Sequence, residues 1–320
     1  MLELCFSHSP FFLNCSSAVS LIFLTRYLMH DCLFPHVGCL AVLHMVSTAA
    51  VAWTSAPSQL ATSFLLSEKL LVACITNVSL ISMNLSLMLN SVGTYQISKI
   101  LMIPTCALIE YFVDKKTVSQ YGAVAMTLVM LGVGIATVSD IRANIAGVFA
   151  AFSGVLSSSG LNVACSHFSR KYNISASEFV VHTMPMQLCG MFVFGPLFDV
   201  FVRGGAPWSW VGNADSTCLY AIFTSCCFAA AVNLSLVACV KRYDASRFQI
   251  LSHTKTVLVL MIGWIDLEGR NVLRQIAGSC IAVTGMVMYS KSKSSIAAEG
   301  QEAKASEPKS ADKGGTAHPS

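Results

Sequence analysis

Residues 84–104 read NLSLMLNSVGTYQISKILMIP and place a lysine, Lys99, within an otherwise apolar pair of segments. A charged side chain near the centre of a bilayer costs about 2.5–3.5 kcal/mol on an insertion scale, so an intramembrane lysine is a functional candidate. Tyr95 and Gln96 precede Lys99 by four and three residues and therefore project from the same face of a helix. We predict that this face binds a ligand.

A second stretch, residues 233–256, repeats this pattern and reads NLSLVACVKRYDASRFQILSHTKT. It again opens with Asn-Leu-Ser-Leu, contains an aromatic-Gln-Ile triplet, and carries a lysine, Lys255, further on. Two intramembrane lysines in two related half-sequences indicate a transporter for an anion.

The composition is that of a membrane protein. Of the 320 residues, 54% are hydrophobic and 11% are charged, whereas soluble domains are about one quarter charged. We therefore expect a lipid bilayer as partner. The net charge of +4 arises in loops and predicts no nucleic-acid partner. Thirteen cysteines include no C-x-x-C pair, which favours small apolar filler over a disulfide or metal framework. We predict no metal site and no cofactor.

Ten segments are apolar enough to be read as membrane crossings of about 20 helical residues each. They lie near residues 11–29, 37–54, 70–89, 92–112, 121–139, 145–166, 180–201, 217–238, 246–265 and 273–290.

The ten spans divide into two sets of five. A tandem duplication of an odd number of spans inverts the second copy, and inverted repeats are common in secondary transporters, which bind substrate between the halves. Lys99 lies in the fourth span and Lys255 in the ninth, the fourth of its half. We predict an all-α integral membrane protein with ten transmembrane helices in two inverted five-helix repeats. The predicted parts are a short cytosolic N-terminus (1–10), the repeats (11–140 and 141–290) and a disordered cytosolic tail (291–320).

Basic residues in the loops orient this bundle. With the N-terminus in the cytosol, ten Lys and Arg residues of the loops face inward and four face outward, which satisfies the positive-inside rule. Both termini are then cytosolic. The inward residues are Lys69, Lys115, Lys116, Arg170, Lys171, Lys241, Arg242, Arg247, Lys291 and Lys293, and the outward ones are Arg142, Arg203, Arg270 and Arg274.

Polar side chains follow one stripe of the third span. Asn77, Asn84 and Ser91 recur every seven residues. They either hydrogen-bond between helices or line a water-filled cavity. Asn233 opens the second copy of the Asn-Leu-Ser-Leu motif, and we include Asn84 and Asn233 among the candidate substrate contacts.

The ninth span is denser in polar groups. One helical face carries Phe248, Ser252 and Lys255, and beside it lies a second row. That second row consists of Gln249, His253 and Thr256. Packing alone does not explain such a cluster at mid-span, and we predict a substrate site there.

A structural ion pair is the alternative role for Lys99 and Lys255. The membrane interior offers few acids for it, because Glu110 and Asp199 fall near span ends. The natural counter-ion is then a ligand, and a phosphate suits a lysine, which contacts it as a point charge.

Small residues seven apart occur in the fifth and tenth spans. Ala125 and Gly132 form one pair, and Gly278 and Gly285 the other. Such spacing permits close helix packing, either within the monomer or across a homodimer.

The stretch 84–104, together with FQILSHTKT at 248–256, resembles the nucleotide-sugar and triose-phosphate transporters of the drug/metabolite transporter superfamily. The resemblance runs from about Ala18 to Ser290. The dipeptide Lys255-Thr256 is similar to that of a subgroup including plant UDP-galactose, UDP-rhamnose and UDP-xylose transporters. Plastid phosphate translocators carry Lys-Arg at this position, whereas this chain has Thr256 in place of the arginine. The N-terminus MLELCFSHSP also lacks the features of a transit peptide, so both features point away from plastids.

This resemblance implies an antiporter of the Golgi membrane, or of the ER membrane, that imports a UDP-sugar and exports UMP by alternating access. Lys99 and Lys255 would bind the phosphates. Tyr95, Gln96, Gln249 and Thr256 would contact the sugar or the base. The family usually has Asn-Lys late in the first span, where this chain has Thr25-Arg26, so the charge is kept and the amide is lost.

Two other functions remain as alternatives. One is an organophosphate/phosphate exchanger of the triose-phosphate translocator type. The other is a membrane enzyme or scaffold that transports nothing. An enzyme acting on phosphorylated donors is expected to carry an acidic metal motif or a cytosolic catalytic loop, and the sequence contains neither. We predict that the chain is not an enzyme.

Overall fold

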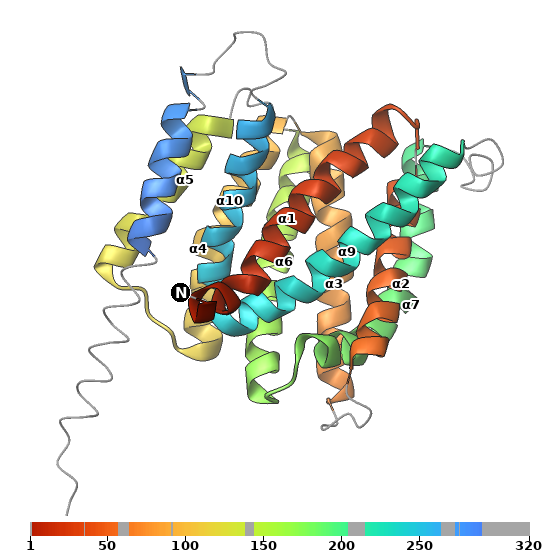
Figure 1. The fold of residues 1–320 in the computed structure, drawn as a ribbon, viewed down its shortest axis with the longest axis horizontal. Coiled ribbons are helices and arrows are strands. Elements are labelled where there is room, and N and C mark those ends of the chain that lie inside the picture. The colour runs from red at the N-terminus through yellow and green to blue at the C-terminus, as the bar shows by residue number, and fades with distance from the viewer. Residues whose placement is uncertain are drawn as a thin grey trace, which may run out of the picture.

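A computed structural model describes residues 2–34, 36–56, 64–90, 92–137, 144–203, 215–263, 273–274 and 276–289; a few side chains inside these ranges are not described. Within them the chain forms helices and no strand (Figure 1). The helices are α1 (Leu2–His30), α2 (Val37–Ser55), α3 (Leu66–Leu89), α4 (Val92–Asp114), α5 (Gln120–Thr137), α6 (Ile145–Lys171), α7 (Ala176–Arg203), α9 (Ser216–Tyr243), α10 (Ala245–Gly263) and a final helix, Ile276–Tyr289.

Each of the ten predicted spans coincides with one of these helices. Six are long and apolar enough to cross a membrane, α5 and the final helix hold shorter apolar stretches, and α4 and α10, which carry the two lysines, are not among the six. Helix α1 begins at Leu2, so residues 2–10 continue the first helix where we expected a separate terminus. The expected tail, 291–320, lies outside the described residues.

Local signals account for several helix boundaries. Asn144 caps α6, because its side chain accepts a hydrogen bond from the N–H of Ala146 at 3.0 Å. Asp215 caps α9 in the same manner through the N–H of Ser216. Asp244 has a φ of 69°, a left-handed conformation that a right-handed helix cannot contain, and it separates α9 from α10.

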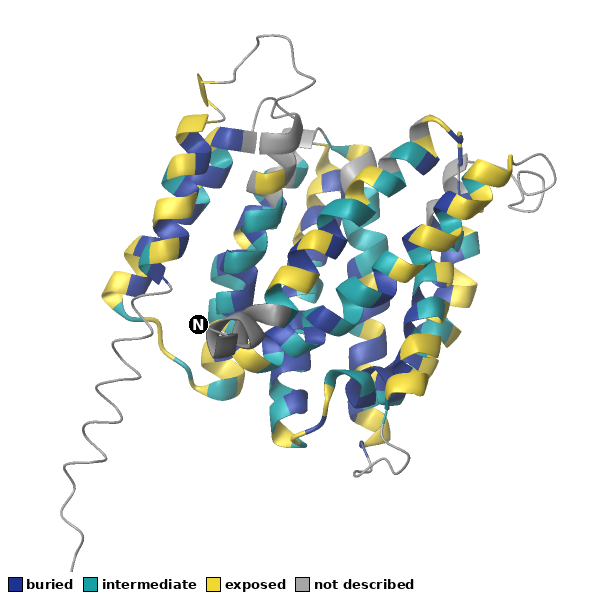
Figure 2. Ribbon diagram, in the orientation of Figure 1, coloured by how far each residue is buried: buried dark blue, intermediate teal, exposed yellow. Residues whose placement is uncertain are grey.

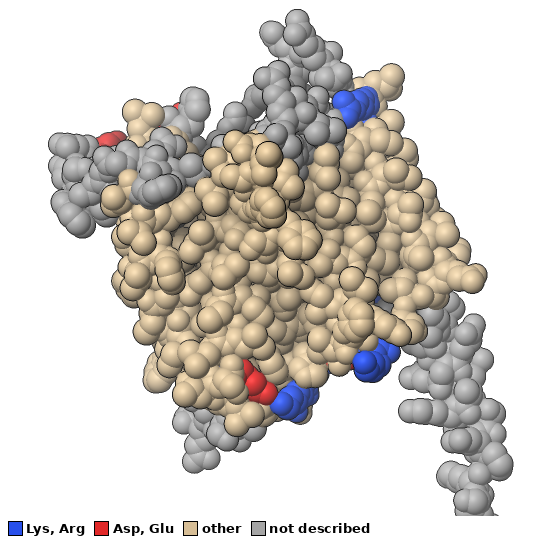
Figure 3. Space-filling model, turned by 180° about the vertical axis from the view of Figure 1, so that it is seen from behind, with Lys and Arg blue, Asp and Glu red and all other residues tan. Residues whose placement is uncertain are grey.

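The outer surface of the bundle is apolar. Phe149, Phe152 and Phe223 are among the large side chains exposed there, and exposed positions run along the outer helices in Figure 2. On the face drawn in Figure 3, the coloured charged groups lie near the upper and lower edges, and the band between them carries none. Such a surface matches the hydrocarbon core of a bilayer.

Three helix pairs make the most extensive contacts in the bundle: α3 with α6, α2 with α7, and α1 with α9. Each pair joins a helix of the first five to one of the second five. In the α2–α7 pair the backbones meet at two glycines, since a Cβ on Gly38 would lie 2.2 Å from the carbonyl oxygen of Gly195. The two sequence halves therefore interlock.

The small residues of the fifth and tenth spans pack within the chain. A Cβ on Gly132 would lie 2.3 Å from the backbone nitrogen of Ala282, and one on Gly285 would lie 2.8 Å from that of Val129. Gly278 is equally close to the backbone of Ala136. Of the two expected uses of these residues, the structure therefore has close packing of α5 against the final helix.

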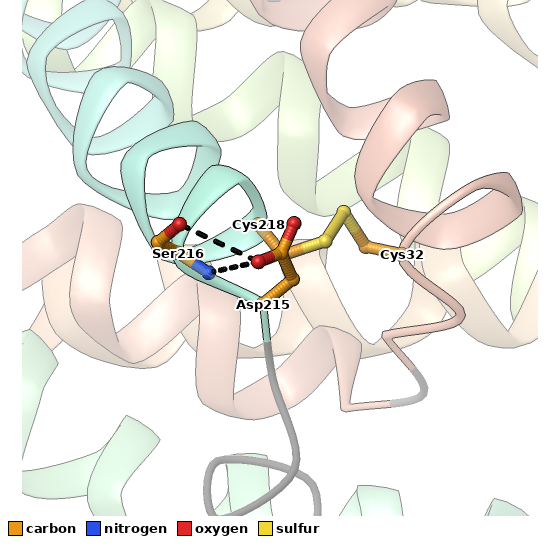
Figure 4. Close-up of a disulfide and its surroundings, with 4 residues drawn as sticks. All are labelled: Cys32, Asp215, Ser216 and Cys218. Atoms are coloured by element: carbon orange, nitrogen blue, oxygen red, sulfur yellow. Dashed lines mark hydrogen bonds between the residues drawn. A yellow bond between two sulfur atoms is a disulfide. The ribbon is translucent and has the colours of Figure 1, made fainter.

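The two ends of the bundle differ in chemistry. We call one the basic end; here α4, α6 and α9 finish, and it carries Lys115, Lys116, Arg170, Lys171, Lys241 and Arg242. The other is the disulfide end, where Cys32 after α1 is bonded to Cys218 in the first turn of α9 (Figure 4). The expectation that the cysteines serve only as apolar filler is wrong for this pair, because the fold brings together two residues 186 positions apart.

Candidate functional site

The two lysines project from helices that pack against each other, α4 and α10. The ammonium nitrogen of Lys99, which is half-buried, lies 4.8 Å from the ring centroid of Tyr95, one turn earlier. The ammonium nitrogen of Lys255, also half-buried, lies 5.4 Å from the ring centroid of Phe248. These contacts confirm the predicted face that Lys99 shares with Tyr95, and the face that Lys255 shares with Phe248. The face of each aromatic ring carries partial negative charge and attracts the ammonium group above it.

Four helices contribute side chains around Lys255. Its charge interacts electrostatically with Lys99 of α4 and with the thiols of Cys15 and Cys239, from α1 and α9. The imidazole of His253, also on α10, interacts electrostatically with both lysines. The structure thus brings the two predicted lysines into one electrostatic environment. The sequence did not predict that Cys15 and Cys239 lie near Lys255, because nothing in a single sequence distinguishes a cysteine beside a candidate site from one in the apolar packing.

Neither lysine has a carboxylate within ion-pairing distance among the residues that the structure describes. The buried acids serve backbone groups elsewhere. Glu110 accepts hydrogen bonds from the N–H groups of Ala245 and Ser246 at the start of α10. Asp199 likewise accepts from the first N–H groups of α2 at 2.8 Å. The expectation that these two acids lie near span ends is confirmed, and the hydrogen bonds of both go to backbone N–H groups away from Lys99 and Lys255.

Gln249 and His253 are both buried on α10. The side-chain oxygen of Gln249 accepts a hydrogen bond of 3.2 Å from Asn162 Nδ2 of α6. The Nε2 atom of His253 is buried and has no hydrogen-bond partner among the described groups. Asn162 is a further residue that the sequence analysis missed; an amide in the middle of an apolar helix was the available signal. Buried amide and imidazole groups can fix the orientation of a ligand.

The two asparagines of the repeated motif are already engaged. Asn84 Nδ2 donates to the carbonyl of Leu80 on its own helix at 2.9 Å, and Asn233 Nδ2 donates to Thr48 Oγ1 of α2 at 3.0 Å. In the predicted stripe of the third span, Asn84 thus bonds within its own helix, which is neither of the two expected roles. Asn233, in the second copy of the motif, makes an interhelical hydrogen bond.

Three predicted positions cannot be placed. The side chains of Gln96, Thr256 and Arg26 lie outside the described residues, although their backbones belong to α4, α10 and α1. Ser91 is not described at all.

One surface depression lies away from this cluster. It is lined by Ser216, Leu219, Tyr220 and Phe223, at the disulfide end of α9. Leu219 and Cys239 are twenty residues apart on one helix, which corresponds to roughly 30 Å. The exposed aromatic lining of this depression offers no charge to an anion, so we place the candidate site at the lysines.

No protein-family model matches the chain. Curated relatives do match it. The UDP-rhamnose/UDP-galactose transporter 2 of Arabidopsis thaliana is 35% identical over 284 residues, which are 87% of this chain and 80% of the relative. The chain belongs to the nucleotide-sugar transporter family.

Two further relatives come from the same plant. UDP-rhamnose/UDP-galactose transporter 1 is 34% identical over 284 residues, which are 87% of this chain and 81% of the relative. UDP-xylose transporter 1 is 27% identical over 281 residues, or 87% of this chain and 82% of the relative. These nucleotide-sugar transporter relatives confirm the resemblance and agree with the prediction that the chain is not an enzyme.

Proposed function

We propose that this protein is a UDP-sugar antiporter. It imports a UDP-sugar of the galactose, rhamnose or xylose class into the Golgi lumen and exports UMP by alternating access. One observation carries the proposal: Lys99 and Lys255 stand on neighbouring helices without a carboxylate partner among the described residues. The named substrates of the relatives, UDP-rhamnose, UDP-galactose and UDP-xylose, supply the diphosphate that such a pair of charges fits.

In this proposal Lys99 and Lys255 bind the phosphates as point charges. Tyr95 and Phe248, each under a lysine, and the buried pair Gln249 and His253 contact the sugar or the base, and so do Gln96 and Thr256. Aromatic rings can stack on a uracil, and amides can hydrogen-bond its edge. We place Asn84 and Asn233 further from the ligand than these residues, because their amide nitrogens already donate to Leu80 and Thr48.

Obligatory exchange follows from the charges. An empty site would have to reorient across the bilayer with two cations that no bound phosphate neutralises, and buried unpaired charges are costly. A bound UMP neutralises them on the return journey. We therefore propose exchange rather than uniport.

We further propose that residues 11–140 and 141–290 are inverted repeats. The contact pattern supports this. If α1 corresponds to α6, α2 to α7, α3 to α9 and α4 to α10, then the α3–α6 pair maps onto α1–α9, and α3–α7 maps onto α2–α9. The bridges between these helix pairs follow the same correspondence. At the basic end Glu68 of α3 contacts Lys171 of α6 at 2.7 Å. At the equivalent place in the inverted copy, which is the disulfide end, α1 and α9 are joined by the disulfide.

The orientation rests on two independent features. Basic loops favour the cytosolic side of a membrane, which assigns the basic end to the cytosol together with both termini. Disulfides persist in the oxidising lumen of the secretory pathway and are rare in the cytosol, which assigns the Cys32–Cys218 end to the lumen. The two assignments coincide.

Counterflow in proteoliposomes tests the function. We expect labelled UDP-sugar to enter vesicles preloaded with UMP much faster than empty vesicles, and other nucleoside monophosphates to support less uptake. Equal uptake into loaded and empty vesicles would contradict antiport. Exchange of triose phosphate against inorganic phosphate, with none of UDP-sugar, would instead establish the organophosphate exchanger.

A further inference from the structure

Five charged or titratable side chains form a network at the basic end, which we call the latch: Asp114, Lys116, His167, Arg170 and Asp244. Lys116 Nζ donates to Asp114 Oδ2 at 2.9 Å and to Asp244 Oδ1 at 2.8 Å. His167 Nδ1 lies 2.6 Å from Asp114 Oδ1. Arg170 donates to the same oxygen of Asp244 that Lys116 contacts.

The latch crosses from one half of the chain to the other. Asp114 ends α4 and Lys116 follows it, whereas His167 and Arg170 belong to α6, and Asp244 is the single residue between α9 and α10. The Lys116–Asp244 and Asp114–His167 contacts of the latch therefore link the two halves. The Arg170–Asp244 contact stays within the second half.

The same end ties α4 to α10 directly. The carboxylate of Glu110, on the last turn but one of α4, accepts the N–H groups of Ala245 and Ser246 that open α10. These are the helices that carry Lys99 and Lys255. Loosening the ties between the ends of α4 and α10 would therefore open the basic end toward the two lysines.

The latch is built to open, in contrast to the bridge at the opposite end. The side chains of Lys116 and Asp244 are 31% and 18% exposed, and ion pairs that water reaches are individually weak. The Cys32–Cys218 bridge is covalent and holds α1 to α9 throughout. The Lys116–Asp244 contact of the latch is thus a bond that thermal fluctuation can break.

We propose that the latch is the cytosolic gate of the transporter, and that it is shut in this structure. In each transport cycle the Lys116–Asp244 and Asp114–His167 contacts break together, while Arg170 keeps Asp244 on the second half. This inference rests on the proposed function and adds to it the residues that close one side of the site.

Cysteine accessibility tests the gate without any substrate. Cys239 and Cys106 are both fully buried. Cys106 lies about one helical turn before Glu110 on α4, and Cys239 lies about one turn before Tyr243, where α9 ends. A charged, membrane-impermeant methanethiosulfonate is added to vesicles whose basic end faces outward, and labelling of each cysteine is followed by mass spectrometry.

We expect slow labelling of Cys239 in the unmodified protein and several-fold faster labelling in Asp244→Asn, which keeps the backbone preference of this left-handed position but loses the charge. Asp215→Asn is the matched control, since Asp215 contacts Ser216 at the disulfide end; its labelling should equal that of the unmodified protein. Unchanged labelling in Asp244→Asn, or equal acceleration in Asp215→Asn, would overturn the gate.

A second measurement locks the latch. Cysteines replace Lys116 and Asp244, and a short bifunctional thiosulfonate joins them through disulfides. We expect exchange to stop on cross-linking and to return when the reagent is reduced, with each single cysteine variant, treated identically, as control. Continued exchange in the cross-linked protein would refute the gate. Absence of UDP-sugar exchange in every variant, with labelling still faster in Asp244→Asn, would refute the proposed substrate and leave the gate intact.

Discussion

Cys32 and Cys218, 186 residues apart in sequence, form a disulfide that ties the end of α1 to the first turn of α9 (Figure 4). Both cysteines lie in the small apolar cluster around Leu28 and Leu40, at the disulfide end. A bond between the halves at this end means that α1 and α9 move together. The bond also requires an oxidising environment at this end of the protein.

The first prediction concerns this bond. In protein isolated from its native membrane, Cys32 and Cys218 should resist alkylation until a reductant is added. Replacing both with alanine should lower the free energy of unfolding by about 2–4 kcal/mol, because the cross-link restricts the unfolded chain. Mass spectrometry of alkylated peptides and thermal unfolding provide the two measurements. Cys227→Ser, at an exposed cysteine, is the control, and free thiols at both positions in native membranes would contradict the luminal assignment.

The second prediction concerns the crossing of α2 and α7. Gly38→Ala places a methyl group 2.2 Å from the carbonyl oxygen of Gly195, so the helices must separate. Overpacking of this kind typically costs about 1–3 kcal/mol. Thermal unfolding in detergent should show the loss. Gly160→Ala should be neutral or better, since its nearest neighbour, a methyl of Ile75, would be 3.9 Å away. An equal effect of the two substitutions would show that the α2–α7 contact is not tight.

The sequence anticipates much of this fold, because ten apolar segments and a positive-inside bias are local properties of the chain. The faces shared by Tyr95 with Lys99, and by Phe248 with Lys255, also follow from helical periodicity alone. Contacts between distant helices do not. The hydrogen bond from Asn162 to Gln249 and the place of Cys239 beside Lys255 depend on how α6, α9 and α10 pack.

The disulfide illustrates the same limit. Thirteen cysteines allow many pairings, and apolar flanking residues favour filler at every one of them. Only the juxtaposition of α1 with α9 selects Cys32 and Cys218. Likewise, the latch residues read as ordinary loop charges until α4, α6 and the α9–α10 junction meet.

The third prediction concerns pH. Burial acts to raise the pKa of Asp114, but hydrogen bonds from His167 and Lys116 outweigh it and hold the pKa below the ordinary 3.8. Burial acts to lower the pKa of Lys116, but hydrogen bonds to Asp244 and Asp114 outweigh it and hold the pKa above 10.5. Arg170, His167 and Glu110 are the other titratable groups facing this pair.

The signs of these shifts define a window. The depressed pKa of Asp114 contributes stability that is present above pH 3.8 and is lost as the pH falls through the folded-state value. The raised pKa of Lys116 contributes stability that is present below pH 10.5 and is lost as the pH rises through the folded-state value. Labelling of Cys239 should therefore be accelerated by Asp244→Asn to the same extent at pH 8 and at pH 9. A latch effect that vanishes between these two values would contradict the assigned charges.

The fourth prediction separates phosphate binding by the lysines from a structural role. A charge-assisted hydrogen bond contributes roughly 1.5–3 kcal/mol, or about one to two decades in affinity. Lys99→Gln and Lys255→Gln should each weaken UMP binding by that amount and nearly abolish exchange. Arg at either position should keep some activity, because the charge remains but the planar fork copies an ammonium poorly. Lys115→Gln, in the loop after α4, is the matched control and should bind UMP normally.

The most direct single measurement is the affinity of the purified protein for UMP, taken together with its melting temperature, in the unmodified protein and in Lys255→Gln. If Lys255 holds a phosphate, the glutamine variant binds UMP one to two decades more weakly. Its melting temperature without ligand stays the same or rises, because an unpaired charge has left the bilayer. A variant that melts at a much lower temperature and yet binds UMP with unchanged affinity would show that Lys255 is structural and that the phosphates bind elsewhere.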